Sequence, residues 1–405
     1  MRRIDPNNFR VATRDTPRQI NRQIALNLIR ARQPISRADL ARSMNVRRGA
    51  VSLIVNELIE EGIIFEGATG ETSRGRKPKF LFVDTRLRCA VAVDIRPTRT
   101  YVMVTDLVGR PLVGVTSFPT ERDPKVFVSE LAAKIRRLLA DHEEIGECAG
   151  IGIVVPGMVD RTGSRILFAP RLGWHDLPLL EPLQAATGLP VSIENSGRAC
   201  ALAKMWATRG GDDTTADFVF VSVSDGLGVG VVVKGELLRG QHNVAGEFGH
   251  IALSIEGPRC ACGANGCWEA YVSNLATLSR YFGRNLADEP LPLESAMITI
   301  DDLIALAHSG DAKARAALQS TARYLGLGLG SVVNAVDPAR IYIGGEITAA
   351  WDLIEVTVRS SLKERTLRPV GRRVEIVVVP ASDYPRLKGA AALVSAPSFA
   401  APVVA

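Results

Sequence analysis

Residues 246–269 read GEFGHIALSIEGPRCACGANGCWE, and this stretch holds three of the six cysteines of the chain, Cys260, Cys262 and Cys267. Together with His250 they offer three thiols and one imidazole, the ligand set of closed tetrahedral zinc sites. The Gly and Pro residues between them allow a short loop to fold back around one ion. Because no protein ligand is missing from this set, we expect structural Zn²⁺ and not a catalytic metal. The alternative is a coincidental group of reduced cysteines beside a histidine.

Strand-like apolar segments lie on both sides of this stretch. Upstream, residues 89–95, 100–109 and 111–118 are three successive strand patterns, followed by a helical pattern and a further strand pattern in residues 150–160. A second series begins at residue 218 with FVFVSVSDGLGVGVVVKG. Strands followed by a helix and another strand, present twice, predict an α/β fold with two lobes, of the actin-like and sugar-kinase (ribonuclease H-like) type.

The first 83 residues have a different pattern. Apolar residues recur at helical spacing in residues 18–32, 37–44 and 47–61. A tight turn between the second and third helices is typical of a helix-turn-helix. Strand patterns at residues 63–65 and 80–82 enclose a loop rich in Gly and basic residues, so we predict a winged helix-turn-helix.

Positive charge is concentrated in this N-terminal part. The first 80 residues hold 16 Lys or Arg and 8 Asp or Glu, whereas the remaining residues hold 33 and 35, which gives net charges of +8 and −2. A basic head on a neutral body indicates a polyanionic partner, and the helix-turn-helix indicates double-stranded operator DNA. The alternative is a three-helix module that docks a protein.

The residues expected to contact DNA lie at two places: around the start of the third helix, which faces the major groove, and in the wing, which faces phosphates or the minor groove. They are Ser36, Arg47, Arg48, Gly49, Ala50 and Ser52 at the first place and Arg74, Arg76 and Lys77 at the second. Ser36 is also expected to cap the second helix, with Asp39 three residues further on. Arg47 stands where a capping Ser or Asn is usual, which leaves the start of the third helix open.

The composition argues against a membrane or secreted protein. No apolar run approaches the ~20 residues that span a bilayer. The first ten residues, MRRIDPNNFR, lack the apolar core of a signal peptide. We therefore expect a cytoplasmic protein with reduced thiols and no membrane partner.

Residues 246–250 and 260–269 together resemble the signature of the ROK family (repressors, open reading frames and sugar kinases). The N-terminal half is similar to the repressor branch of that family, which includes N-acetylglucosamine, glucose and xylose regulators. The resemblance implies a sugar site that lies beside the zinc loop. Its implied ligands are Asn195, Glu247, His250 and Glu269, with Asn243 and Gly246 shaping the same pocket. His250 would bind zinc through one ring nitrogen and a sugar hydroxyl through the other.

Three positions depart from the pattern of the family's sugar kinases. Ser196 follows Glu194 and Asn195 where the kinases carry the Asp that deprotonates the sugar hydroxyl, and a hydroxyl cannot act as a base near neutral pH. Residues 94–98 read DIRPT in place of Asp-x-Gly-x-Thr, and residues 224–226 read SDG in place of Gly-Thr-Gly. Proline lacks an N–H and aspartate repels phosphate, so we expect sugar binding without phosphoryl transfer.

The resulting prediction is a sugar-responsive DNA-binding regulator, a repressor of carbohydrate genes, that acts as a homodimer or homotetramer. The expected domains are a head at residues 1–83, a first lobe at 84–195 completed by 375–405, and a second lobe at 196–374. Gly326, Gly328 and Gly330 are expected to bring backbones together, either within a subunit or between subunits. Two alternatives stay open: an active ATP-dependent sugar kinase with a DNA-binding domain, and a ROK regulator controlled by a protein partner.

Overall fold

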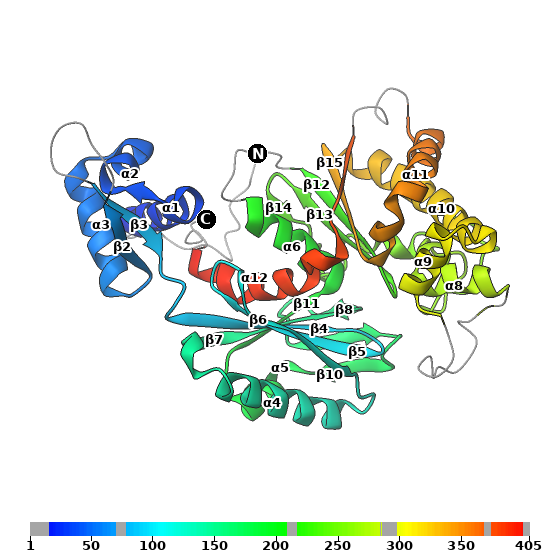
Figure 1. Ribbon diagram of the computed structural model, residues 1–405, viewed down its shortest axis with the longest axis horizontal. Coiled ribbons are helices and arrows are strands. Elements are labelled where there is room, and N and C mark those ends of the chain that lie inside the picture. Colours follow the sequence, from blue (N-terminus) through cyan, green and yellow to red (C-terminus); the bar gives the residue numbers. More distant parts are fainter. Residues whose placement is uncertain are drawn as a thin grey trace.

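The computed structural model describes residues 16–69, 78–208, 217–283, 285, 298–367 and 374–399. Within these ranges the chain forms a small head followed by two lobes, each built on a five-stranded sheet (Figure 1). The predicted two-lobed α/β architecture is therefore confirmed.

The described part of the head has three helices and a sheet with the strand order β1-β3-β2. Its elements are α1 (Thr16–Arg32), β1 (Ile35–Ser36), α2 (Arg37–Met44), α3 (Arg48–Glu60), β2 (Ile64–Thr69) and β3 (Lys79–Val83). Asn45 closes the turn between α2 and α3 with φ of 53°, a left-handed conformation that Asn tolerates. The short strand β1 was not expected from the sequence, and it ties the helices to the wing by pairing with β3. The order of the three helices and of the β2-β3 hairpin is the one that a winged helix-turn-helix has.

The first lobe is built on the sheet β11-β7-β4-β5-β6. The elements of this lobe are β4 (Arg88–Ile95), β5 (Arg99–Asp106), β6 (Pro111–Pro119), α4 (Pro124–Ala140), η1 (Glu143–Ile145), β7 (Glu147–Val155), α5 (Leu180–Thr187) and β11 (Val191–Asn195). A side sheet consists of β8 (Met158–Val159), β9 (Arg165–Ala169) and β10 (Trp174–Pro178). Alternate residues of β4 face opposite ways: Val91 and Val93 pack with α4, whereas Ala92 packs with the C-terminal helix α12 (Pro385–Phe399).

The second lobe is built on the sheet β14-β13-β12-β15-β16. Its elements are α6 (Ser196–Thr208), β12 (Phe218–Val223), β13 (Leu227–Val233), β14 (Glu236–Leu237), η2 (Phe248–His250), α7 (Glu269–Val272), α8 (Asn274–Phe282), α9 (Ile300–His308), α10 (Ala312–Val336), β15 (Arg340–Gly344), η4 (Glu346–Ala350), α11 (Trp351–Arg365), β16 (Glu375–Val378) and η6 (Ala381–Asp383). Helices α10 and α11 cover one face of the sheet, and α6 covers the other.

The boundary expected at residue 375 needs a correction. Strand β16 pairs in parallel with β15, with Ile376 opposite Ile341, so it extends the sheet of the second lobe. The chain crosses to the first lobe only after this strand, so that within the C-terminal segment it is α12 that packs on β4 and β7. The sequence prediction missed this because a short apolar strand fits the edge of either sheet.

The glycines of α10 make contacts within the subunit. A Cβ on Gly326 would lie 2.4 Å from the carbonyl oxygen of Val358 in α11, and a Cβ on Gly328 would lie 2.0 Å from the Trp268 ring. Gly330 likewise lies against Arg365. Of the two possibilities left open by the sequence, these contacts support close packing inside one chain.

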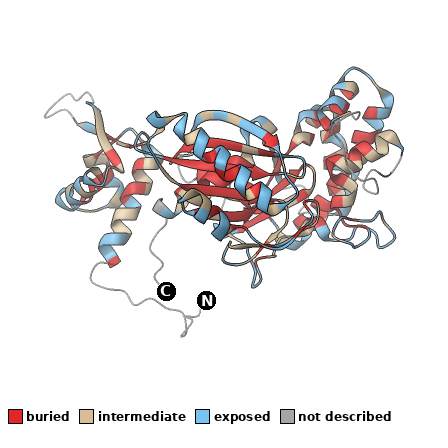
Figure 2. Cartoon of the chain, turned by 90° about the horizontal axis from the view of Figure 1, so that it is seen from below, coloured by how far each residue is buried: buried red, intermediate tan, exposed pale blue. Residues whose placement is uncertain are grey.

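Buried residues are concentrated in the sheets and on the inward faces of the helices (Figure 2). None of the helices in the described ranges is both long enough and apolar enough to cross a membrane.

Candidate functional site

The four predicted metal ligands, His250, Cys260, Cys262 and Cys267, lie together. Their ligand atoms are all within 4.8 Å of one another. The Sγ atoms of Cys262 and Cys267 are 3.7 Å apart, and Sγ of Cys260 is 3.8 Å from Nδ1 of His250. Sulfur ligands at ~2.3 Å from a tetrahedral Zn²⁺ lie ~3.8 Å from each other. The cluster therefore fits a single metal ion.

The loop that carries the cysteines is shaped by tight turns. Cys260 donates its backbone N–H to Ala264 at 2.8 Å, and Arg259 and Asn265 form an antiparallel bridge. Gly266 has φ of 71°, and a Cβ there would lie 1.5 Å from the carbonyl oxygen of Ser254. Only glycine fits this position, and it brings the Cys267 side of the loop back toward His250.

Glu269 connects the four predicted metal ligands to both lobes. It is buried at the start of α7, and its Oε2 accepts the backbone N–H of Leu227 at 2.9 Å. Its Oε1 lies 3.4 Å from Nη2 of Arg171 in the first lobe and 3.8 Å from Sγ of Cys260. The carboxylate is thus fixed in the cleft between the lobes, next to the metal cluster.

Glu247 precedes the short helix η2, which ends at His250. Burial raises the pKa of Glu247 above its ordinary value, although the charges of Arg198 and His250 act in the opposite direction. His250 turns Nδ1 toward Cys260, and the residue as a whole is exposed. Gly246 has φ of 90°, a conformation that favours glycine, and this turns the chain into η2.

Two residues expected to bind sugar have structural roles. Asn243 is 2% exposed, and its amide nitrogen donates to the carbonyl oxygens of Val159 and Asp160 at 3.0 and 3.1 Å. Asn195 donates to the carbonyl oxygen of Gly157 at 2.8 Å, and its side-chain oxygen accepts two backbone N–H groups at the start of α6. Both amide hydrogens of Asn243 are thus engaged inside the protein, so its side chain can shape the pocket but has no amide hydrogen left for a sugar. Asn195 keeps one amide hydrogen for a ligand.

A buried ionic network behind these residues was missed by the sequence analysis. Arg198 is 1% exposed, and its Nε lies 2.8 Å from Oε1 of Glu194. Its Nη1 donates to the carbonyl oxygen of Asn243 at 2.8 Å, while Arg239 contacts the other oxygen of Glu194 at 2.5 Å. One signal was available: Glu194 and Arg198 are four residues apart, and Arg198 is surrounded by small apolar residues in its helix.

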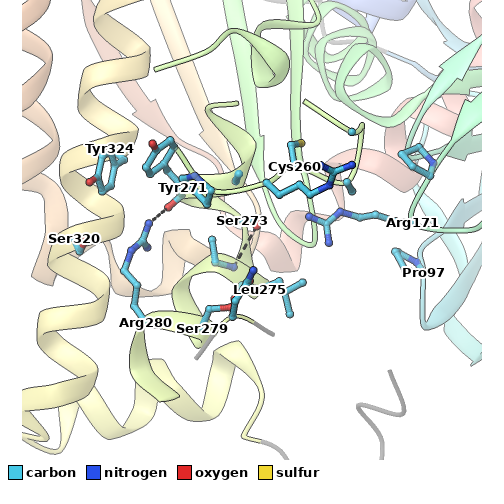
Figure 3. A pocket seen from close by; sticks show the side chains of 18 of the residues that line it. Pro97, Arg171, Cys260, Tyr271, Ser273, Leu275, Ser279, Arg280, Ser320 and Tyr324 are labelled. Atoms are coloured by element: carbon cyan, nitrogen blue, oxygen red, sulfur yellow. Dashed lines mark hydrogen bonds between the residues drawn. The ribbon is translucent and has the colours of Figure 1, made fainter. Parts of the chain in front are cut away.

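A cavity of about 840 Å³ lies between the lobes. Pro97 and Arg171 of the first lobe line one side, and Tyr271, Arg280 and Tyr324 line the other (Figure 3). The rings of Tyr271 and Tyr324 are stacked with centroids 4.4 Å apart. Arg171 and Cys260, which both contact Glu269, are also part of the lining, whereas Glu247, His250 and Glu269 are not, so these three side chains lie next to the cavity and not on its wall.

Charged side chains occupy the turn at residues 94–98, which stands where the family's kinases have the Asp-x-Gly-x-Thr pattern. Arg96 lies 2.8 Å from Asp94 and 2.7 Å from Glu346 of the second lobe. The space left between these residues and Arg386 is only about 20 Å³, which is room for about one water molecule. Burial, together with the nearby Glu346, raises the pKa of Asp225, the residue that stands in the second phosphate loop.

The start of α3 forms an exposed basic surface. Arg47, Arg48, Gly49 and Ala50 are exposed, and Ser52 is half-buried with its hydroxyl bonded to the carbonyl oxygen of Arg48 at 3.0 Å. Arg47 occupies the N-cap position without a side-chain capping bond, so α3 begins at Arg48. The first N–H groups of α3 thus remain free of a side-chain cap, as a phosphate contact requires.

The prediction that Ser36 contacts DNA needs a correction. It is 4% exposed, and its hydroxyl accepts the backbone N–H of Asp39 at 3.1 Å and donates to the carboxylate of the same residue at 2.6 Å. Its side chain therefore caps α2 as expected and is not a surface contact for DNA. The wing residues Arg74, Arg76 and Lys77 lie outside the described residues.

Comparison with known proteins identifies the family. The ROK family matches residues 90–396. The xylose repressor of Bacillus subtilis is 29% identical over 369 residues, covering 91% of this chain and 92% of the repressor. The crystal structure of a ROK family transcriptional regulator, a homologue of the E. coli MLC protein, superposes with a TM-score of 0.78 at 29% identity, covering 95% of this chain and 97% of that one.

A kinase of known structure matches less of the chain. The ROK family glucokinase from Streptomyces griseus, in complex with glucose and AMPPNP, superposes with a TM-score of 0.64 at 28% identity. The superposition includes 98% of the glucokinase but only 75% of this chain. The match to the family over three quarters of the sequence, together with the two-lobed fold and the Cys/His loop, shows that the chain belongs to the ROK family.

Proposed function

We propose that this chain is a sugar-responsive transcriptional repressor that binds operator DNA through its head and a sugar between its lobes. One observation carries this proposal: the similarity to a xylose repressor and to a ROK regulator structure extends over more than 90% of the chain, head included. The glucokinase leaves a quarter of the chain unmatched.

The head supplies the DNA-binding surface. Arg47 and Arg48 are exposed at the start of α3, in the position from which a recognition helix contacts base edges and phosphates. Arg37 is tied to Glu66 at 2.8 Å and to Asn56 at 2.9 Å, so it acts inside the head. We assign operator contact to Arg47, Arg48, Gly49, Ala50 and Ser52, and by sequence to Arg74, Arg76 and Lys77.

The sugar site is assigned to Glu247, His250 and Glu269, with a single hydrogen bond from Asn195. A fixed carboxylate can accept hydrogen bonds from two vicinal hydroxyls, and Glu269 is held in the cleft by Leu227 and Arg171. The bound Zn²⁺ would be structural: four protein ligands fill its tetrahedral sites and fix the loop that carries Glu269. Zinc supplies folding free energy here and no chemistry on the sugar.

We also propose that the chain does not transfer phosphate. Arg96 and its carboxylate partners occupy the place of the phosphates, and only about 20 Å³ remains free among these side chains. Ser196 is 4% exposed and offers only a hydroxyl at the position of the kinase base. The loss of a general base alone lowers a rate by ~10²–10⁴-fold.

Operator half-sites are spaced by about one helical turn or a multiple of it, so a pair of heads is required for tight, specific binding. We infer a homodimer, in which the sugar changes the spacing of the two heads and releases the DNA.

The test uses the full-length protein and the duplex that it selects from a random library. Fluorescence anisotropy would measure operator affinity with and without D-xylose, D-glucose and N-acetyl-D-glucosamine. We expect one of these sugars to weaken DNA binding at least tenfold. Glu269→Ala should bind DNA normally and lose the sugar response, whereas the exposed control Glu181→Ala should keep it.

Two results would overturn the proposal. ATP-dependent phosphorylation of any of these sugars at a rate typical of kinases would make the chain an enzyme. Selection of no specific duplex would exclude the operator-binding role. A specific duplex with no response to any sugar would favour control by a protein partner.

A further inference from the structure

Helix α6 connects the candidate sugar site with the DNA-binding head. It begins at Ser196, directly after Asn195, and ends at Thr208, so its 13 residues have a length of about 20 Å. We propose that α6 transmits the state of the sugar site to the head through a joint formed by Trp206 of α6, Arg30 and Asn27 of α1, and Phe399 of α12. The sugar as signal rests on the proposed function; the joint itself rests on the contacts below.

The first turn of α6 is tied to the loop of the sugar site. The side-chain oxygen of Asn195 accepts the backbone N–H groups of Gly197 and Arg198 at 2.8 and 3.1 Å. The Arg198 side chain donates to the carbonyl oxygen of Asn243, in the loop that leads to Glu247. A ligand that displaces this loop therefore displaces the start of α6, because the two are joined by buried hydrogen bonds.

The body of α6 is clamped on two sides. A Cβ on Gly197 would lie 2.5 Å from the backbone nitrogen of Val229 in β13, so helix and strand touch through their backbones. On the other side, a Cβ on Gly389 of α12 would lie 2.0 Å from the carbonyl oxygen of Ala199. Such close packing makes α6 and α12 move together, because a packed interface shifts as a unit and does not deform gradually.

The last turn of α6 forms the joint with the head. The Arg30 guanidinium lies 3.7 Å from the centroid of the Trp206 ring, and its Nη1 donates to the Trp206 carbonyl oxygen at 3.2 Å. Phe399 packs edge-on against the same ring with centroids 5.2 Å apart. Asn27 donates to the carbonyl oxygen of Phe399 at 2.7 Å. Figure 1 shows the head next to the C-terminal end of α12, where α1 and α12 are in contact.

The joint is part of the core of the head. Trp206 and Phe399 belong to the same buried cluster as Leu26 and Ile29 of α1 and as Val55 of α3. A change in the direction of α6 is thereby passed to α1 and then to the recognition helix. The relevant residues are positioning residues: none of them is placed to touch DNA or sugar.

The first experiment separates coupling from binding. Operator affinity of the full-length protein would be measured with and without the most effective sugar of the panel, and sugar affinity by calorimetry. We expect Trp206→Ala and Arg30→Ala to keep sugar affinity within about threefold of wild type. The sugar-induced loss of DNA affinity should fall from at least tenfold to less than twofold. Trp206→Phe and Arg30→Lys, which keep an aromatic ring and a cation, should restore most of the response.

The matched control is Arg32→Ala. Arg32 lies two residues from Arg30 on α1 but contacts Ser43 within the head, so its variant should respond to sugar like wild type. Full sugar response in both alanine variants at the joint would overturn the proposal.

The second experiment needs no sugar. Hydrogen–deuterium exchange would be followed in peptides from α1 and α3 and, as internal reference, from β4 and β7. Trp206→Ala should speed exchange in the head at least tenfold and leave the reference strands unchanged. Unchanged protection of α1 would refute the joint even if sugar releases DNA. Absence of any sugar effect on the wild type, together with faster exchange in the variant, would refute the proposed function and support the joint.

Discussion

Arg96 of the first lobe and Glu346 of the second lobe form an ion pair across the cleft, with 2.7 Å between Nη1 and Oε1. Asp94 lies 2.8 Å from the same guanidinium, and Asn274 donates to the other oxygen of Glu346 at 3.1 Å. Burial acts to lower the pKa of Arg96, but the two carboxylates raise it above its ordinary value. The pair therefore joins the two lobes at the place where kinases of the family hold phosphate.

Removal of Arg96 should cost far more than removal of a surface arginine. Arg96→Ala leaves Asp94 and Glu346 in a buried site with Arg386, 3.8 Å from Asp94, as the neighbouring cation, and we expect it to lower the free energy of unfolding by about 3 kcal/mol. The double variant Arg96→Ala/Glu346→Ala should lose less than the sum of the single variants. Urea denaturation of the wild type, Arg96→Ala, Glu346→Ala and the double variant would measure the free energy of unfolding of each. Arg359→Ala, which breaks a half-exposed pair with Glu355, should cost under about 1 kcal/mol. If the double variant lost the full sum of the two single losses in unfolding free energy, Arg96 and Glu346 would not interact.

Glu346 should make stability depend on pH. Burial acts to raise its pKa, but the charges of Arg96 and Arg386 outweigh this and hold the pKa at about 2, below the ordinary value of 4.5. Because the folded-state pKa is depressed, the ionised Glu346 stabilises the protein above pH 4.5, and this contribution is lost as the pH falls toward 2. The gap in denaturation midpoint between wild type and Glu346→Gln should narrow over this range. If the difference in denaturation midpoint did not change with pH, the ionisation of Glu346 would not contribute to stability.

Metal removal should unfold the loop from residue 250 to residue 267. We expect one Zn²⁺ per chain by elemental analysis, and Cys262→Ser should lower both zinc content and melting temperature, since structural zinc contributes to folding. A strong chelator should have the same effect on the wild type. Cys148→Ser serves as control, because Cys148 lies in the first lobe, outside the cluster. Equal zinc content in wild type and Cys262→Ser would rule out this ligand set.

Substitution at the start of α3 should weaken operator binding and alter its salt dependence. Each phosphate contact contributes ~0.9 to the slope of log affinity against log salt. If Arg48 contacts phosphate, Arg48→Ala should lower the slope by about that amount; if Arg47 contacts a base, Arg47→Ala should relax specificity with the slope kept. The exposed Arg137→Ala on α4 provides the control. Unchanged affinity in both head variants would remove α3 from the interface.

Features that depend on local spacing were predictable. The helices of the head follow from apolar residues at helical periodicity, and α2 and α3 lie within a residue of their predicted bounds. The Cys₃His set follows from residue types within one short stretch. In both cases the interacting residues are close in sequence, so chain connectivity already brings them near each other.

The roles of individual side chains in the site were less predictable. Asn243 has the chemistry of a sugar ligand, yet its amide is used by Val159 and Asp160, which approach from another strand and turn. Ser36 has the chemistry of a DNA contact, yet it pairs with Phe80 of β3 and is buried inside the head. Residue type states what a side chain can bind, whereas burial decides what it can reach.

The sequence alone determined the class of this protein: a basic N-terminal head, a two-lobed α/β body and a Cys/His loop with carboxylates beside it. Only the tertiary structure decided that Arg96 meets Glu346 and that Arg30 meets Trp206, pairs separated by 250 and 176 residues. Helical periodicity and ligand sets are encoded within a few turns of chain. Contacts between lobes, and between head and body, arise only where the sheets bring distant segments together, and no local pattern specifies the partner.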